Sequence, residues 1–264
     1  MIAADWLIGL AAATALLWIL DLLYVASGIR RIESLEDVTP AADSDCPPAS
    51  ICVAARNEAD DVEEAVASFL ALDYPELEVV AVDDRSTDDT GRILERLADR
   101  DERLTVHHVN DLPDGWLGKN HALHRAAREA AGDVLLFTDA DVTFETSSLR
   151  RAVGHMERNG LDHLTAPPGQ AWPTSLLRAV GSVLQWVLLH RIRPWLVGAD
   201  DSDAHAGVGA FNLVRRSAYE TAGGHEAIAT RPVDDMALAE RLQATGARYA
   251  GSSGETIPSD PSHL

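Results

Sequence analysis

The chain contains an apolar run that ends in two aspartates, Val134-Leu135-Leu136-Phe137-Thr138-Asp139-Ala140-Asp141. A short continuous apolar run of this kind predicts a strand that is buried on both faces of an α/β sheet. Ligands of such sheets bind outside the carboxyl ends of the strands, which is where Asp139 and Asp141 follow. Two carboxylates at this point can hold a hard divalent cation against a diphosphate. Because Asp-x-Asp is common by chance, a solvated loop is the alternative.

Two more predicted strands end in polar residues. Apolar runs predict strands over residues 50 to 55 and 77 to 82, and the patterns after them predict helices over residues 60 to 72 and from about 88. The first strand ends in Ala55-Arg56-Asn57-Glu58, and the second is followed by Asp83-Asp84-Arg85-Ser86-Thr87-Asp88-Asp89-Thr90. A strand over residues 104 to 107 and a helix over 121 to 131 continue the alternation, which is typical of a largely parallel sheet.

In a parallel sheet the three strand ends lie on one edge and form a single crevice. A carboxylate there can accept a hydrogen bond from a base N–H or a ribose hydroxyl, while a cation neutralises a diphosphate. The crevice therefore suits a nucleotide together with a metal. Ser86, Thr87 and Asp88 are also good N-caps for the helix that follows. We expect Asp84 to be functional and Asp88 to be a cap.

The composition limits the partners of the protein. A length of 264 residues with 46% hydrophobic residues predicts one α/β domain and a short appendage. The formal net charge is -20 and Lys119 is the only lysine, so no basic stripe is available for nucleic acid, which we exclude as a partner. The acidic surface favours a halophile, that is, a protein adapted to a salt-rich cytoplasm, although GC-rich codon usage would also replace lysine by arginine. Cys46 and Cys52 lack the spacing of a metal site.

The N-terminus has the character of a transmembrane helix. Residues 6 to 26 are apolar except for Thr14 and Asp21, and about 21 helical residues at ~1.5 Å each span the ~30 Å hydrocarbon core. A secretory signal would need a basic start, which this chain lacks. Arg30 and Arg31 follow directly, so the positive-inside rule predicts a single-pass protein of the cell membrane with its remaining chain in the cytoplasm. A buried helix of a soluble domain is the alternative.

These patterns divide the chain into segments. We expect an N-terminal anchor over residues 1 to 31, an acidic, proline-containing linker over 32 to 49, a catalytic domain over 50 to 257 and a polar tail over 258 to 264. Within the domain, residues 176 to 197 combine a wide apolar face with tryptophan and arginine. This pattern predicts either a helix at the membrane interface or a core helix that covers the active site.

The strand-end motifs together resemble a known family. Ala54-Ala55-Arg56-Asn57-Glu58, the segment from Val82 to Thr90 and Thr138-Asp139-Ala140-Asp141 are similar in order and spacing to motifs of the family 2 glycosyltransferases, which have the GT-A fold. The segment Gly115-Trp116-Leu117-Gly118-Lys119-Asn120-His121-Ala122-Leu123 resembles the membrane enzymes that glycosylate isoprenoid lipids, including hopanoid-associated and carotenoid-type transferases. The resemblance covers roughly residues 50 to 250. It implies an α/β sheet of the Rossmann-like GT-A type, with Mn²⁺ or Mg²⁺ as the cofactor and a nucleotide-sugar as the donor.

The resemblance also implies roles for individual residues. Asp84 would contact the nucleobase, and Asp83 would lie in its surroundings. Asp139 would contact the ribose or the diphosphate together with the metal, and Asp141 would contact the metal. Lys119 would contact the phosphates as a compact charge. Asp234-Asp235 takes the place of the family's Glu-Asp pair, so Asp235 is the expected catalytic base, with Asp234 beside it. The donor-binding positions expected from these motifs are Ala55, Arg56, Asn57, Glu58, Asp83, Asp84, Lys119 and Asp139. His225 is expected to be a structural histidine.

The predicted activity is transfer of one sugar, with inversion, to a lipid or isoprenoid hydroxyl by a membrane-anchored enzyme. A Gln-x-x-Arg-Trp motif of processive members does not occur in the sequence, which disfavours polymer synthesis. Two alternatives remain open at this point. One is a nucleotidyltransferase on a similar fold, although residues 54 to 58 lack the glycine-rich basic loop that it would need. The other is an inactive membrane scaffold that kept the fold.

Overall fold

The computed structural model describes residues 2–167, 174–197, 202 and 204–251, so the predicted polar tail lies outside the described residues. Within them, the strands form a seven-stranded sheet of order β3-β2-β1-β4-β6-β5-β7. The strands are β1 (Ala49–Ala55), β2 (Leu77–Asp84), β3 (Leu104–Val109), β4 (Val134–Asp139), β5 (His163–Thr165), β6 (Asn212–Arg215) and β7 (Tyr249–Gly251). The first four are mutually parallel, and β6 runs antiparallel to β4 and β5. The expected α/β fold with a mostly parallel sheet is confirmed.

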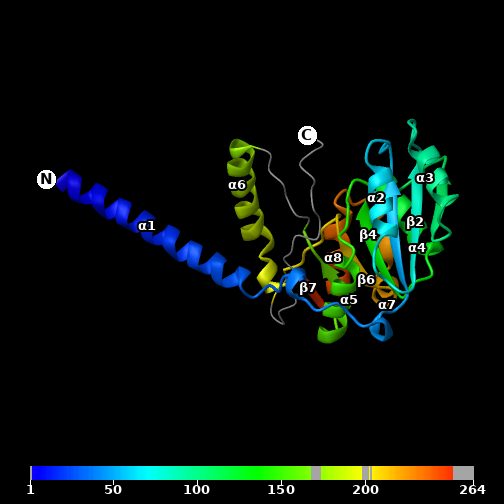
Figure 1. The fold of residues 1–264 in the computed structure, drawn as a ribbon. Helices are drawn as coiled ribbons and strands as arrows, with labels where there is room; N and C mark the ends of the chain where they lie inside the picture. The colour runs from blue at the N-terminus through cyan, green and yellow to red at the C-terminus, as the bar shows by residue number, and fades with distance from the viewer. Residues whose placement is uncertain (1, 168–173, 198–201, 203, 252–264) are drawn as a thin grey trace.

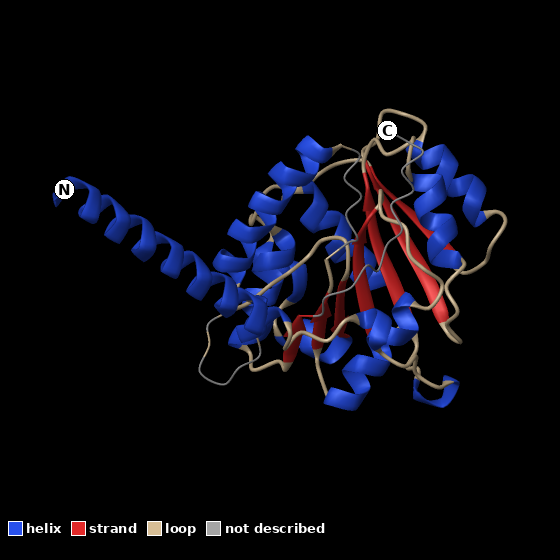
Figure 2. Ribbon diagram, turned by 60° about the vertical axis from the view of Figure 1, so that its left-hand side comes forward, coloured by secondary structure: helices blue, strands red, loops and turns tan. Residues whose placement is uncertain are grey.

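Helices cover both faces of the sheet (Figure 2). One core contains alternate strand residues such as Ile51 and Val79 with α2 (Val62–Leu70), α3 (Thr90–Ala98) and α5 (Ser148–Asn159). The opposite core contains the intervening residues, among them Val80 and Leu135, with α4 (Gly118–Glu129), α7 (Arg216–Thr221) and α8 (Asp234–Ala244). Successive strand residues thus point into different cores. The continuous apolar runs in the sequence reflect this burial on both faces.

Strand register brings the predicted motifs together. Ala55 of β1 pairs with Asp83 of β2, and Ala54 pairs with Asp139 of β4. Because β1 lies between β2 and β4, the residues that follow all three strands emerge at one edge. The carboxyl ends of the three strands therefore lie at one edge of the sheet, which is where the crevice is expected.

The segment over residues 32–49 is more than a linker. It contains two short 3-10 helices, η1 (Leu35–Asp37) and η2 (Asp43–Asp45), and Leu35 and Val38 are only 1% exposed within the core. Arg151 of α5 donates to the carbonyls of Glu36 and Val38, the latter at 2.8 Å. The two buried apolar residues and the arginine of α5 thus dock this segment on the domain.

Two helices project from the domain, α1 (Ile2–Ile29) and α6 (Ser175–Ile192), and both lie on the same side of the sheet (Figure 1). Within Trp6–Ile29, an 18-residue window has a mean hydropathy of 2.0 and none of that window is buried. α1 is therefore long and apolar enough to cross a membrane, and it is not a core helix. α6 is also exposed, with Gly181 its only buried residue, so it is not a core helix either. The helix expected to reach residue 197 ends earlier, because Arg193 adopts φ 50° before Pro194 begins η3 (Pro194–Leu196).

Candidate active site

The loops after β1 and β2 are joined by Asn57. Its backbone N–H donates to Ser86 Oγ at 3.0 Å, and its side-chain Oδ1 accepts from the backbone N–H of Thr87 at 2.8 Å. Asn57 has φ 57°, a left-handed conformation that asparagine tolerates better than most residues. Glu58 adds a third link, since its N–H donates to Thr90 Oγ1 at 2.8 Å. The asparagine of the first motif thus holds the two loops in register.

Asp83 and Asp84 have different partners because consecutive strand residues point to opposite faces. Asp84 is 3% exposed and accepts two hydrogen bonds from Arg85, at 2.8 and 2.9 Å. Asp83 lies 3.0 Å from His108 Nδ1 and also accepts from the backbone N–H of Ser86 at 3.3 Å. Glu95 lies 3.1 Å from the other ring nitrogen of His108. Asp84 is therefore paired with Arg85, while Asp83 stabilises the turn that follows β2.

Asp88 has the capping role expected for it. Its Oδ1 accepts from the backbone N–H of Thr90 at 3.0 Å, and its Oδ2 accepts from the N–H of Ala59 at 3.1 Å. These hydrogen bonds lower the pKa of Asp88, the largest contribution coming from the Thr90 hydroxyl. The capping residue consequently ties the start of α3 to the first loop as well.

Helix α4 begins against the second loop. An added Cβ at Gly118 would overlap the Asp84 carboxylate and come within 2.7 Å of Arg85 Nη2, so only glycine fits there without displacing them. Two residues further, the Asn120 side chain donates to the carbonyls of Ile228 and Arg231, at 2.6 and 3.0 Å. These bonds hold the start of α4 next to the segment that leads into α8. No local pattern in the sequence reveals the close contact at Gly118 or the two hydrogen bonds of Asn120.

Lys119 lies where three of these elements meet. Its Nζ is 2.7 Å from Asp139 Oδ1 at the end of β4 and 3.5 Å from Asp234 Oδ1 at the start of α8. Desolvation alone would lower the Lys119 pKa, but the charges of Asp234 and Asp139 outweigh it and the pKa is raised. Because 40% of the side chain is exposed, solvent screens these ion pairs. Lys119 is thus held as a cation at the predicted phosphate position.

An excess of negative charge faces the Asp-x-Asp motif. The pKa of Asp141 is raised by desolvation and then by the charge of Asp139. The pKa of Glu58 is raised by desolvation and then by the charge of Asp141. These carboxylates are therefore near enough to repel one another, a situation that a bound cation relieves.

The residues fit a divalent cation in their chemistry. Asp139 and Asp141 offer oxygen ligands of the kind that Mn²⁺ and Mg²⁺ prefer. Among the described residues, no three His, Cys, Asp or Glu side chains are grouped as a complete ligand set. A cation held here by two carboxylates would need further oxygens, which a diphosphate supplies.

Asp235 lies in the first turn of α8, against the backbone at Gly207. Its Oδ1 accepts from the Met236 N–H at 2.7 Å, and an added Cβ at Gly207 would overlap the Asp235 carbonyl. Burial, and then repulsion by Asp234, raises the pKa of the Asp235 carboxyl. A carboxylate with a raised pKa is a stronger general base. Gly209 lies nearby against Asp139, because its added Cβ would be 2.9 Å from Asp139 Oδ2.

The remaining predicted positions have clear places in the structure. Ala55 is fully buried, so only its backbone can face a ligand, whereas Arg56 is exposed beside the crevice. His225 is 1% exposed and lies 2.9 Å from the Tyr219 hydroxyl, and burial lowers its pKa to about 3. The expectation of a structural histidine agrees with this burial.

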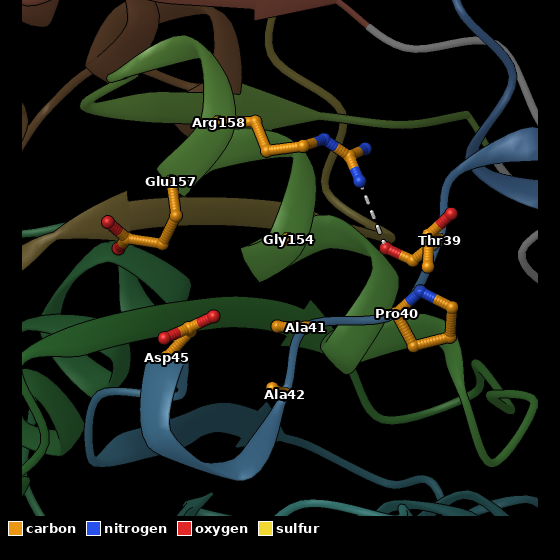
Figure 3. Close-up of a pocket in the computed structure, with 8 residues that line it drawn as sticks. All are labelled: Thr39, Pro40, Ala41, Ala42, Asp45, Gly154, Glu157 and Arg158. Atoms are coloured by element: carbon orange, nitrogen blue, oxygen red, sulfur yellow. Dashed lines mark hydrogen bonds between the residues drawn. The ribbon is translucent and has the colours of Figure 1, made fainter.

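A separate pocket lies away from these residues. Its volume is about 440 Å³, and it is enclosed between the 39–45 segment and α5 (Figure 3). Its lining consists of Thr39, Pro40, Ala41, Ala42, Asp45, Gly154, Glu157 and Arg158. None of these is a predicted site residue, so the crevice at the strand ends remains the candidate active site.

The architecture and the crevice together define a GT-A-type α/β domain. The family model for glycosyl transferase family 2 matches residues 50–222, and the chain belongs to this family. Among solved structures, it is similar to the mannosyltransferase PcManGT of Pyrobaculum calidifontis, solved in complex with GDP-Man and Mn²⁺. That comparison has a TM-score of 0.65 and 25% identity and covers 95% of this chain and 68% of the other. TarS 1-349 of Staphylococcus aureus, in complex with UDP-GlcNAc, shares the fold with a TM-score of 0.52 at 21% identity over 77% of this chain and 55% of that one.

Two characterised relatives extend the comparison. The chain is 32% identical over 130 residues to the glycosyltransferase AglD of Haloferax volcanii, which covers 47% of this chain and 19% of AglD. It is 24% identical over 191 residues to the 4,4'-diaponeurosporenoate glycosyltransferase of Staphylococcus aureus strain USA300, covering 72% of this chain and 49% of that enzyme. The chain thus spans about half the length of the second relative and about a fifth of the first.

Proposed function

We propose that the protein is a membrane-anchored, inverting glycosyltransferase that moves one sugar from a nucleoside-diphosphate donor to a lipid or isoprenoid hydroxyl. The observation that carries this proposal is the position of Lys119, whose Nζ lies 2.7 Å from Asp139 and 3.5 Å from Asp234. We take Asp139 and Asp141 as the cation ligands, Lys119 as the phosphate-binding cation and Asp235, next to Asp234, as the base.

Each group has a distinct part in the proposed reaction. Asp84 and the loop fixed by Asn57 receive the nucleoside, and Lys119 neutralises charge on the diphosphate. Asp139 and Asp141 would hold Mn²⁺ or Mg²⁺, which stabilises the departing diphosphate. Asp235 takes the proton from the acceptor hydroxyl as its oxygen attacks the anomeric carbon on the face opposite the leaving group.

The lipid acceptor is supported by two features. The first is the exposed apolar helix α1, which we propose anchors the chain with its domain on the cytoplasmic side, where Arg30 and Arg31 follow the span. The second is the similarity to the 4,4'-diaponeurosporenoate glycosyltransferase. The sugar and its nucleotide are left open in this proposal.

Two variants separate donor binding from transfer. Asp141→Asn should weaken cation-dependent binding of a nucleoside diphosphate, because an amide lacks the charge that a hard cation prefers. Asp235→Asn should bind the nucleoside diphosphate normally but lose transfer by about 10² to 10⁴, the contribution expected of a general base. Binding is measured by titration with Mn²⁺ present, and transfer by following a labelled nucleotide-sugar into an isoprenoid alcohol extract.

Asp99→Asn is the matched control, since Asp99 is an exposed carboxylate at the end of α3. Normal transfer by Asp235→Asn would contradict the assignment and direct attention to Asp234. A nucleotidyltransferase would instead release pyrophosphate from a nucleoside triphosphate and a sugar phosphate. An inactive scaffold would neither transfer nor hydrolyse any nucleotide-sugar in a panel with Mn²⁺ or Mg²⁺.

A further inference from the structure

Helix α6 is attached to one face of α1 by polar and aromatic contacts. His190 of α6 lies with Nε2 2.8 Å from Asp21 Oδ1. The Trp18 and Trp186 rings lie next to this pair, with their centroids 5.2 Å apart, and Trp186 also packs on His190 at 4.3 Å. The one acidic residue in the middle of the apolar helix therefore has a specific partner on α6.

A second set of contacts lies two turns further along α1. The Trp195 ring meets Tyr24 edge to face at 5.3 Å and is only 9% exposed. An added Cβ at Gly28 would overlap the Trp195 ring. Trp18, Asp21 and Gly28 recur at a spacing that places them on one helix face. α1 therefore contacts both α6 and the η3 segment that follows it, and the two sets of contacts form one junction.

The rest of α6 presents an uncovered apolar stripe. Its exposed large hydrophobic residues recur at intervals of three and four, which puts them on one side of the helix. They are Leu176, Leu177, Val180, Val183, Leu184, Val187 and Leu188, each at least 45% exposed. Arg178, Ser182 and Gln185 occupy the other side. A stripe of this length is unusual on a surface that faces only water.

Arginines gather at the junction of the two helices. Arg30 and Arg31 follow α1, while Arg191 and Arg193 lie at the end of α6, and all four are exposed. None of the four forms a salt bridge within the described part of the chain. In a chain with a net charge of -20, such a group of uncompensated cations favours contact with an anionic surface.

The directions of the helices indicate how α6 would meet that surface. α1 and α6 diverge from their shared junction and do not run alongside each other (Figure 1). If α1 crosses a bilayer, α6 cannot cross it in parallel with α1. An amphipathic helix in this situation lies in the interface, with its apolar face about 5–10 Å deep at the boundary of headgroups and acyl chains.

We infer that α6 is a membrane-docking helix, latched to the anchor by Asp21–His190 and Trp18–Trp186, whose apolar stripe lies in the cytoplasmic leaflet of a bilayer with anionic headgroups. The four arginines contact those headgroups. This inference rests on the proposed anchoring by α1. It adds a second lipid-contacting surface and assigns Asp21 a role in positioning α6.

Depth-dependent quenching in reconstituted bilayers tests the inference on the full chain. A fluorescent label is attached at Val183→Cys on the stripe, or at Ser182→Cys on the other side, in a Cys46→Ser background, since Cys52 is fully buried. Vesicles contain a phosphatidylcholine and phosphatidylglycerol mixture with doxyl-labelled lipid, and iodide is the aqueous quencher. The label at 183 should be quenched by the lipid at least about threefold more than the label at 182, which iodide should quench instead.

A label at Leu16→Cys separates the anchor from α6. Quenching at 16 and 183 but not at 182 supports the inference. Quenching at 16 without quenching at 183 overturns it and leaves the anchor intact, whereas no quenching at 16 overturns both. Equal lipid quenching at 182 and 183 would show a helix surrounded by lipid, and protection from both quenchers would show a protein partner. Either result overturns the inference.

Removing the latch provides a second test. Asp21→Leu should leave the quenching at 16 unchanged and reduce the difference between 182 and 183, because α6 loses its fixed rotation. Ser27→Ala is the control on the same helix, since the Ser27 hydroxyl bonds only within α1, to the Tyr24 carbonyl at 2.8 Å. If the quenching difference between labels at 182 and 183 is unchanged in Asp21→Leu, the proposed role of Asp21 in positioning α6 is overturned.

Discussion

Lys119 forms an ion pair of 2.7 Å with Asp139, and this contact joins the first turn of α4 to the last residue of β4. The same ammonium group is 3.5 Å from Asp234 Oδ1. The side chain thus lies between Asp139, a proposed cation ligand, and Asp234, the neighbour of the proposed base Asp235. A bound diphosphate, with its cation on Asp139 and Asp141, would draw Lys119 towards the phosphate oxygens.

Replacing this lysine should weaken donor binding. Lys119→Met removes one charge-assisted contact to the diphosphate, and we expect about a tenfold loss of nucleoside diphosphate affinity. The melting temperature should change little, since the lysine side chain is 40% exposed and its ion pairs are screened. Isothermal titration measures the affinity, and Arg92→Gln, on an exposed pair with Asp89, is the control. Unchanged affinity would remove Lys119 from the donor site.

Removing a repelled carboxylate should stabilise the free protein. The pKa of Asp141 is raised in the folded state. Ionised Asp141 therefore destabilises the folded protein above that pKa, and this effect is absent below the ordinary aspartate pKa. Asp141→Asn should therefore melt higher than the parent at pH 7, by a few degrees at most because solvent screens the site. The difference should disappear as the pH falls below the ordinary aspartate range. A lower melting temperature at pH 7 would contradict the repulsion.

Adding a methyl group at Gly118 should damage the nucleotide loop. Gly118→Ala places a Cβ against Asp84 and Arg85, so we expect at least about tenfold weaker nucleoside diphosphate binding. Stability should fall little, because alanine favours the helix that begins there. Gly9→Ala, with no atom near its added Cβ, is the matched substitution. Equal affinities for the two variants would show that the Asp84–Arg85 pair moves without consequence.

Mild acid should destabilise the fold through its buried histidines. Burial lowers the pKa of His163 to about 4 and that of His225 to about 3. Because both folded pKa values lie below the ordinary value near 6.5, stability is lost as the pH falls from there towards the folded values. At pH 5 each histidine lowers the free energy of unfolding by about 2 kcal/mol relative to pH 7. Urea unfolding in detergent measures this, and the loss should shrink by about that amount in His225→Gln.

The acidic surface should make stability depend on salt. A net charge of -20 repels itself less at high ionic strength, since the Debye length falls from ~10 Å at 0.1 M to ~3 Å at 1 M. The melting temperature should therefore rise as KCl is increased from about 0.1 M to 1 M. Sucrose of matched osmolality serves as the control. An unchanged melting temperature would exclude adaptation to a salt-rich cytoplasm.

The long parallel strands could be predicted from sequence, whereas the second half of the sheet could not. β1, β2 and β4 are buried on both faces, so their apolar runs are continuous and end at polar motifs. β5 and β7 contain three residues each, too few to show any period, and β6 joins the sheet antiparallel. These pairings are tertiary, and no local pattern in the sequence reveals them.

The residues of the candidate site that directly follow a strand could be predicted from the sequence. The contacts between elements that are distant in the sequence could not. Asp84, Asp139 and Asp141 follow predicted strands, so their common edge was foreseeable. The contact of Lys119 with Asp234 depends on how Asn120 holds the segment before α8, a contact across more than 100 residues. The partner of Asp21 was equally hidden, because His190 lies 169 residues away.

The docking of the 32–49 segment by Arg150 and Arg151 fixes how far the enzyme can reach. A free chain of 18 residues would let a domain wander by roughly 23 Å from its tether. Here Arg150 holds the Ala41 carbonyl and Asp43, and Arg151 holds the carbonyls of Glu36 and Val38. If α1 spans a bilayer as proposed, these contacts hold the strand-end site at one height above it. The docked segment would then set the distance from the bilayer to the site. Acceptors would be selected by the distance between their hydroxyl and the lipid surface.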